Sequence, residues 1–187
     1  HVVETDHIIP KKNLAEIKSN YDQKSQEDYK TKENLANCQI IRNEFWHKLL
    51  PYFNSKSNIF SGRNIDLNQY DHWISTGCGM SGCVYSFVVT KNYCDVELAL
   101  SSSNKDFNKK VFDYFYDKKD NIENEFGDKL FWERLDDKKM SRISYRLEEV
   151  SIFVIVDWNK MITFLTENMI KLDKVLKKYI NSYSRKK

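Results

Sequence analysis

The segment from Ser75 to Val84, STGCGMSGCV, has the residue types of a phosphate-binding loop, because three of its glycines form the pattern G-x-G-x-x-G. Such a loop binds a dinucleotide where it follows a strand and opens a helix, whose N-terminus then faces the pyrophosphate. Behind Gly82, however, apolar residues alternate with a period of two, which predicts a strand. No Lys-Ser or Lys-Thr pair follows, as it would in a P-loop. We therefore expect the glycines to turn one strand into the next and to bind no nucleotide.

Metal-ligand residue types occur in the same region of the chain: His72, Cys78, Cys83 and Cys94. A zinc ribbon needs two closely spaced cysteine pairs, and only Cys78 and Cys83 come near that spacing. Cys94 falls on the apolar face of a predicted strand, where a core cysteine belongs. The four cysteines are dispersed, so we expect reduced thiols in a cytoplasmic protein, with no metal and no other cofactor.

Two patterns near the N-terminus have the residue types of metal-dependent nucleases. The stretch TDHIIP resembles the opening of the HNH motif, in which His7 would be the general base and Asp6 a metal ligand. Asp6 with Glu16 and Lys18 also fits the carboxylate and E-x-K pattern that holds Mg²⁺ in PD-(D/E)XK nucleases. Neither pattern has its expected frame, because no apolar ββα pattern follows His7 and LAEIKSN is not a buried strand. A metal-dependent nuclease is therefore an alternative only, and we assign no catalytic residue.

Basic residues gather between residues 132 and 146. Alternate positions Arg142, Ser144 and Arg146 would share one face of a strand, and Trp132 and Tyr145 are interleaved with the cations. A basic sheet face with aromatic side chains can contact phosphates and stack on bases. We therefore predict nucleic-acid-binding residues here: Arg134, Lys138, Lys139, Arg142 and Arg146. The acidic residues nearby leave open the alternative of a solvated surface: Asp136, Asp137, Glu148 and Glu149.

The elements that must position these residues follow from periodicity. Apolar residues three and four apart predict a helix from about Leu35 that ends or bends at Pro51. The same spacing predicts a helix over residues 107–126, with Ser103 as its N-cap and Gly127 after its end. Alternating residues predict strands in five stretches: HWIST, GCVYSFVVT, CDVELAL, KLFWERL and SRISYRLEEVSIFVIV.

The C-terminal region carries an unbroken heptad pattern: Trp158, Ile162, Leu165, Met169, Leu172, Leu176, Tyr179 and Tyr183. Spacings of four and three predict a helix of about two dozen residues. This helix could pack along its own sheet or the first helix, or it could form an intermolecular coiled coil, so a homodimer is open. Residues 157–187 contain eight Lys or Arg against three Asp or Glu, which suits either a polyanion partner or the helix dipole.

The order of predicted elements, α-β-β-β-α-β-β-α, indicates an α+β fold. We expect a mostly antiparallel sheet of about five strands with helices packed on it and a long C-terminal helix. Residues 35–187 would form this single domain, and the polar residues 1–34 would be a linker or the tail of an upstream domain. No apolar run of about 18 residues occurs, so we expect no membrane partner.

Five separate blocks of the sequence resemble, in order, family 4268 of the domains of unknown function, from bacteria and archaea. The blocks are RNEFWHKLL (42–50), WISTGCGMSG (73–82), DVELAL (95–100), LFWERLDDKKMSRI (130–143) and DWNKMITFLTENMIKLDKV (157–175). The resemblance covers about residues 40–181. It implies a domain that often lies C-terminal to a nuclease-like domain of the PD-(D/E)XK type, in proteins linked to restriction or phage defence. No catalytic residue transfers with it, and Trp132 and Arg134 would serve as core and ion-pair residues.

We therefore expect a non-catalytic accessory domain of a nuclease-type restriction or phage-defence protein. Its partner would be DNA or an N-terminal nuclease domain of the same chain. The alternatives are a dimerisation module that uses the C-terminal heptad helix and a metal-dependent nuclease that uses the DHIIP segment.

Overall fold

The computed structural model describes residues 14–63 and 71–184, and the chain divides into two compact units, residues 1–38 and 39–187. Helix α1 (Leu14–Asn54) begins in the first unit and ends in the second. It begins well before Leu35, where the apolar spacing predicts its start. The Glu, Lys and Gln residues before that point favour helix without forming an apolar stripe, so periodicity alone does not detect this part.

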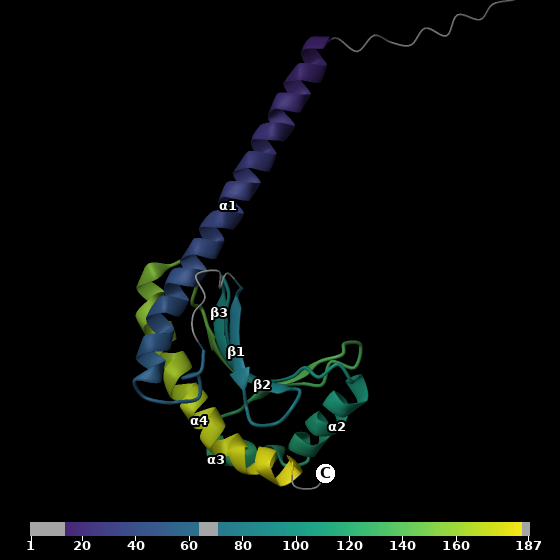
Figure 1. Cartoon of the computed structure of the whole chain (residues 1–187), viewed down its shortest axis with the longest axis vertical. Coiled ribbons are helices and arrows are strands. Elements are labelled where there is room, and N and C mark those ends of the chain that lie inside the picture. The colour runs from purple at the N-terminus through teal and green to yellow at the C-terminus, as the bar shows by residue number, and fades with distance from the viewer. Residues whose placement is uncertain (1–13, 64–70, 185–187) are drawn as a thin grey trace, which may run out of the picture. The chain divides into compact units, whose positions relative to one another are not determined.

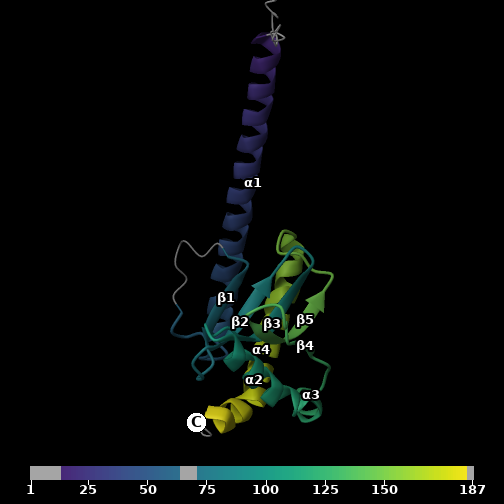
Figure 2. The same cartoon turned by 90° about the vertical axis from the view of Figure 1, so that its right-hand side faces the viewer.

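Five strands of the second unit form one antiparallel sheet in the order β1-β2-β3-β5-β4. Figure 1 labels β1, β2 and β3, and Figure 2 labels every strand of the sheet. The strands are β1 (Trp73–Gly77), β2 (Cys83–Val89), β3 (Tyr93–Leu100), β4 (Phe131–Glu133) and β5 (Ser141–Glu148). The central strand is β3, and the two edges are β1 and β4. The predicted α+β fold class, with its five-stranded antiparallel sheet and long C-terminal helix, is confirmed.

Three helices, together with the last turns of α1, cover one side of this sheet, which we call the core face. They are α2 (Lys105–Tyr116), α3 (Lys119–Phe126) and α4 (Trp158–Ser184), and Figure 2 shows the sheet in front of α4. The core face is lined by buried apolar side chains of the strands, among them Tyr85, Phe87, Val96, Leu98 and Ile143. Within the two ranges described, no helix is both long enough and apolar enough to cross a membrane.

The heptad positions of α4 are used within the chain. From Trp158 to Leu176 they are buried, and the last two, Tyr179 and Tyr183, are half-buried. The indole of Trp158 meets the ring of Phe45 edge to face at 5.4 Å, and its Nε1 donates to the carbonyl oxygen of Ile152 at 2.7 Å. This is packing of the helix along its own sheet. An intermolecular coiled coil through the same positions would first have to expose them.

Helix α1 runs past Pro51, where the sequence predicts its end or a bend. Its last turn is held by Phe53, which meets Phe60 at 5.4 Å and Phe87 at 5.2 Å between ring centroids. Proline removes one hydrogen bond from the helix, whereas burial of this phenylalanine fixes the turn that follows.

The predicted middle helix is divided at Asp117 and Lys118 into α2 and α3, and Gly127 ends α3 as predicted. Its N-cap is Asn104 and not Ser103. Asn104 Oδ1 accepts a hydrogen bond from the backbone nitrogen of Phe107 at 3.0 Å, which satisfies a free donor of the first turn.

Strand β5 ends at Glu148 and does not continue to Val156, as the alternating sequence predicts. Glu149 has a φ of 58°, which a strand does not accommodate. Beyond it a 3₁₀ turn, η1 (Ile155–Asp157), leads into α4. The apolar residues after β5 are therefore divided, with Ile152 buried and Val156 exposed.

The glycine-rich segment connects β1 to β2, as predicted. Gly79 and Gly82 have φ values of 94° and 80°, which favour glycine. A Cβ at Gly82 would also lie 2.7 Å from the Cβ of Ser102, so the backbone approaches its neighbour closely there. Strand β2 begins directly at Cys83, so no helix N-terminus follows the glycines.

Candidate functional site

The five predicted nucleic-acid-binding residues lie in three different environments. Arg142 and Arg146 lie on β5 and point away from the helices. Arg134 follows β4 and reaches α2, where it forms a bidentate pair with Asp113 at 2.8 and 3.0 Å. It also pairs with Asp136. Its role is thus the ion-pair role that the family resemblance implies.

Lys138 and Lys139 lie in the turn between β4 and β5, and both are exposed. Helix α2 contacts this turn through Lys109, whose ammonium group is buried. Lys109 Nζ lies within hydrogen-bond distance of four oxygens: Arg134 O, Leu135 O, Met140 O and Ser141 Oγ. Asn108 Nδ2 donates to the carbonyl oxygen of Lys139 at 2.9 Å. The two exposed lysines are therefore presented by a fixed backbone.

Trp132 and Tyr145 do not accompany the arginines, although the sequence interleaves them. Both pack on the core face, where Trp132 Nε1 donates to Glu123 Oε1 at 2.9 Å and the Tyr145 ring stacks on Phe164 at 5.4 Å. Successive residues of a strand point to opposite sides, so these rings and the arginines cannot share a face.

The side of the sheet opposite the core face, which we call the open face, consists of the alternate positions of the five strands. They are Trp73, Ser75, Gly77, Val84, Ser86, Val88, Tyr93, Asp95, Glu97, Ala99, Phe131, Glu133, Arg142, Ser144, Arg146 and Glu148. Figure 2 is viewed from this side. Two of its aromatic side chains lie at the edges of the sheet, Trp73 on β1 and Phe131 on β4, and they are 42% and 47% exposed.

One row of the open face is polar across the sheet. The strand pairing places Ser75 opposite Ser86, Ser86 opposite Glu97, and Glu97 opposite Ser144. Ser75 Oγ and Ser86 Oγ form a hydrogen bond at 2.8 Å. Glu97 therefore lies at the middle of the central strand with a serine on either side.

Glu97 is only 6% exposed, and its Oε2 has no hydrogen-bond partner among the described residues. The Oγ of Ser144 is likewise buried without a partner in this part of the chain. Burial raises the pKa of Glu97 to about 7, and the nearby charge of Arg142 opposes that rise. The carboxyl group therefore changes its charge near neutral pH.

Both arginines of the open face are paired with acids from other strands. Arg146 contacts Asp95 through two hydrogen bonds of 2.8 and 2.7 Å, and its guanidinium lies 3.6 Å from the centre of the Tyr93 ring. The hydrogen bond with Asp95 raises the pKa of Arg146, and burial raises the pKa of Asp95 although Arg146 opposes this. The open face is therefore not a simple basic surface.

Arg142 pairs with Glu133 of β4 through its Nε at 2.5 Å and its second terminal nitrogen at 3.1 Å. This contact lowers the pKa of Glu133. The open face thus carries two arginines against four carboxyl groups: Asp95, Glu97, Glu133 and Glu148.

A cavity of about 420 Å³ opens beside Glu97, within the size range of small-molecule sites. Its walls include Glu97 and Arg142, the aromatic side chains of Trp73 and Tyr93, and Met140. The described part of its lining comes from the strands and the segments next to them. Burial lowers the pKa of His72, which also lines it.

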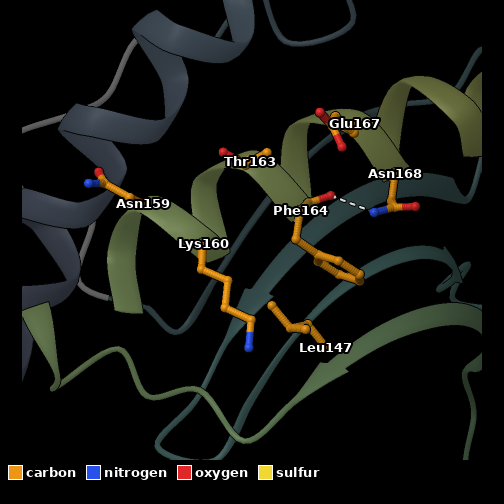
Figure 3. Close-up of a pocket in the computed structure, with 7 residues that line it drawn as sticks. All are labelled: Leu147, Asn159, Lys160, Thr163, Phe164, Glu167 and Asn168. Atoms are coloured by element: carbon orange, nitrogen blue, oxygen red, sulfur yellow. Dashed lines mark hydrogen bonds between the residues drawn. The ribbon is translucent and has the colours of Figure 1, made fainter. Parts of the chain in front are cut away.

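A second hollow lies between β5 and α4, and Figure 3 shows Lys160, Phe164 and Leu147 around it. Asn168 Nδ2 donates to the carbonyl oxygen of Phe164 at 2.8 Å. The charged residues that line this second hollow, Lys160 and Glu167, are exposed. It lacks a buried polar group left without a partner among the described residues, so the open face is the stronger candidate.

Sequence reasoning missed Glu97 as a site residue. The alternation of β3 does place Asp95 and Glu97 opposite the apolar residues of the strand, and that was the available signal. An acid at the middle of a central strand indicates that its face is not part of an apolar core. The row of serines around it depends on register, which a single sequence does not provide.

The described part of the structure does not provide the secondary structure that the metal-dependent nuclease motifs require. Asp6 and His7 lie outside the described residues, and the backbone at residues 16–18 belongs to α1, where the nuclease motif requires a strand. Cys83 and Cys94 are buried in the core. Over residues 14–63 and 71–184, no three His, Cys, Asp or Glu side chains are grouped to hold a metal ion.

Comparison of the chain with curated proteins and with solved structures found no match. One family model matches residues 41–180, which is more than half of the chain. This range contains every strand of the sheet and nearly all of α4. The chain therefore belongs to the family described as Domain of unknown function (DUF4268).

Proposed function

We propose that this domain is a non-catalytic accessory module that binds single-stranded nucleic acid on the open face of its sheet. It would act for a nuclease-type domain of a restriction or phage-defence protein, the context that the family resemblance implies. The four cysteines are free thiols, which suits the cytoplasm as its location.

The observation that carries this proposal is the pair of exposed aromatic side chains at the two edges of the open face. Trp73 and Phe131 lie on β1 and β4, and the guanidinium of Arg146 lies 5.2 Å from the centre of the Phe131 ring. Proteins that bind single strands stack bases on such aromatic side chains. Bases suit this face better than phosphates, because its arginines are already paired with carboxylates.

Phosphate contacts would come from Lys138 and Lys139, which lie in the turn before β5 and next to the open face. Lys109 and Asn108 hold that turn in place, so little ordering is needed when a strand binds. Arg134, which the sequence predicts to bind nucleic acid, is not among these phosphate contacts. Its side chain is paired with Asp113 of α2 instead.

The test is binding of a labelled single-stranded DNA to the full chain, measured by fluorescence anisotropy over a range of salt concentrations. The double variant Lys138→Gln/Lys139→Gln should bind more weakly and reduce the salt slope by about 1.4, the value for two phosphate contacts. The matched control, Lys110→Gln/Lys174→Gln, removes two exposed lysines of the helices. No binding by the wild type at low salt would overturn the proposal.

A second candidate is a protein-interaction module. Four consecutive apolar residues, Phe153–Val156, are exposed before α4, and Val156 is 86% exposed. A homodimer through this segment would leave the packing of α4 intact, unlike one through the heptad positions. Sedimentation of the wild type and of Val156→Asp would test it, because only a self-associating chain would change its sedimentation coefficient.

A further inference from the structure

The open face holds two buried polar groups that its internal contacts leave unused. Glu97 Oε2 and Ser144 Oγ are both without a hydrogen-bond partner among the described residues, and the two residues are direct neighbours in the β3–β5 pairing. A buried polar atom without a partner costs free energy, commonly about 1 to 3 kcal/mol. Of these two residues, Glu97 lines the cavity, so its unused hydrogen-bonding capacity points to a ligand there.

We propose that the cavity beside Glu97 is a base-reading pocket, which takes one unstacked nucleobase and meets its hydrogen-bonding edge with Glu97. This inference rests on the proposed function, because it names what the single strand inserts into the open face.

The chemistry of the walls favours a nucleobase over other ligands. Trp73 lines the cavity and provides a flat apolar surface against which a ring can pack. A phosphate group would meet the carboxyl group of Glu97, and the guanidinium of Arg142 in the same lining is already paired with Glu133. A metal ion would find no set of three ligands among the described residues. A neutral heterocycle with donors and acceptors along one edge meets none of these obstacles.

The protonation state of Glu97 sets which base fits. As a carboxylate it only accepts hydrogen bonds, which suits the two adjacent N–H donors of guanine. As a neutral acid it donates one and accepts one, which suits the ring nitrogen and amino group of adenine or cytosine.

Several charged or titratable groups surround Glu97: Arg142 and Arg146 of β5, Asp95 of β3, Glu133 of β4, and His72 at the cavity wall. Burial raises the pKa of Glu97 to about 7, whereas burial lowers the pKa of His72 from its ordinary value. Between pH 6 and pH 8.5 Glu97 therefore loses its proton, whereas the lowered pKa of His72 favours the neutral imidazole.

The experiment compares three oligonucleotides with the full chain at pH 6 and pH 8.5. They are short single strands identical except at one central position, which carries guanine, adenine or no base. For the wild type we expect the affinity for guanine relative to adenine to rise about tenfold from pH 6 to pH 8.5, the size of one discriminating contact. Glu97→Gln keeps one donor and one acceptor, so it should show the wild-type preference of pH 6 at both values.

The control variant Glu167→Gln changes an exposed glutamate of α4 and should behave as the wild type does. Thermal melting verifies that Glu97→Gln is folded, and Ser144→Ala provides a second variant, at the residue paired with Glu97. If the strand without the base binds as well as the others, or if Glu97→Gln shifts with pH as the wild type does, the pocket is refuted while the proposed function stands. If no oligonucleotide binds, the proposed function fails, and the pocket fails with it.

Discussion

Glu97 lies directly opposite Ser144 in the pairing of β3 with β5, and each side chain has a buried oxygen without a hydrogen-bond partner in the described part of the chain. The pair occupies the middle of the sheet, between two arginines that are already neutralised by acids. Interiors normally satisfy such groups. The fold therefore retains an unfavourable arrangement at the place where its outer surface is hollowed, and stability measurements can detect it.

The first prediction concerns stability as a function of pH. Burial raises the pKa of Glu97 from 4.5 to about 7, so between these values the folded chain holds a proton that the unfolded chain has released. The free energy of unfolding should therefore fall as the pH rises from about 4.5 to about 7. In Glu97→Gln this contribution is absent, so above pH 7.5 the variant should be more stable by up to about 3 kcal/mol.

Urea denaturation of both proteins at pH 5 and pH 8 measures this difference. Glu167→Gln, on the surface of α4, should follow the wild type at both values. A wild type whose stability does not decline relative to Glu97→Gln would show that the carboxylate of Glu97 is solvated in the folded chain.

The second prediction ranks the two arginines of the open face. Arg146 pairs with Asp95, whose side chain is 4% exposed, whereas both partners of the Arg142–Glu133 pair are 32% exposed. Arg146→Met leaves the buried carboxylate of Asp95 without its ion-pair partner and should lower the free energy of unfolding by about 3 kcal/mol. Arg142→Met breaks a more hydrated pair and should cost about 1 kcal/mol or less.

Adding Asp95→Asn to Arg146→Met should recover much of that loss, because it removes the stranded charge. Chemical denaturation of the single and double variants gives the coupling energy directly. Equal losses from the two single arginine variants would contradict the ranking. Binding assays on Arg146→Met require this stability correction before any effect is ascribed to contact with nucleic acid.

Periodicity predicts much of this fold, because each prediction needed only local information. The strand behind Gly82, the apolar side of β3 and the heptad face of α4 all follow from spacing within one element. The predicted end of β5 is wrong, since alternation continues through Val156 while the backbone turns at Glu149. Side-chain spacing does not reveal a positive φ at a residue that is not glycine.

The candidate site is harder to predict, because it depends on pairing between distant strands. Sequence analysis identifies Arg146 as a candidate, yet its partner Asp95 is 51 residues away and meets it only through the register of β3 and β5. The arginines of the basic cluster therefore look free in the sequence, whereas in the fold they are paired with acids. The row of serines on either side of Glu97 is a consequence of the same register.

The third prediction concerns Lys109, whose ammonium group lies beneath the turn that carries Lys138 and Lys139. It donates to three carbonyl oxygens and one hydroxyl, at distances of 2.5 to 3.0 Å. Lys109→Met keeps the length of the side chain but leaves these acceptors without their donor. We expect a loss of about 3 kcal/mol or more, because hydrogen bonds from charged groups are strong and their partners stay buried.

The neighbouring Lys110 provides a matched control, because it is exposed on the same helix. Lys110→Met should change the free energy of unfolding by no more than about 0.5 kcal/mol. Hydrogen exchange of the backbone amides at residues 134–141 should accelerate in Lys109→Met and not in Lys110→Met. Unchanged exchange there would mean that the turn is held by its strands alone.

The fourth prediction separates two constraints in the glycine-rich turn. Gly79 and Gly82 both have positive φ, but only at Gly82 would an added Cβ meet another residue, at 2.7 Å from the Cβ of Ser102. Gly79→Ala should therefore cost about 1 kcal/mol from backbone strain alone. Gly82→Ala adds a steric clash and should cost about 3 kcal/mol.

Removing the opposing side chain tests the cause. In Gly82→Ala/Ser102→Gly the closest clash is absent. Adding Gly82→Ala to Ser102→Gly should therefore lower the free energy of unfolding by less than adding it to the wild type. That single variant is needed because Ser102 Oγ accepts a hydrogen bond from the backbone nitrogen of Asn104 at 3.2 Å, beside the N-cap of α2. If Gly79→Ala and Gly82→Ala cost the same, the close approach between this turn and the start of α2 is not what requires glycine at position 82, and positive φ alone explains both residues.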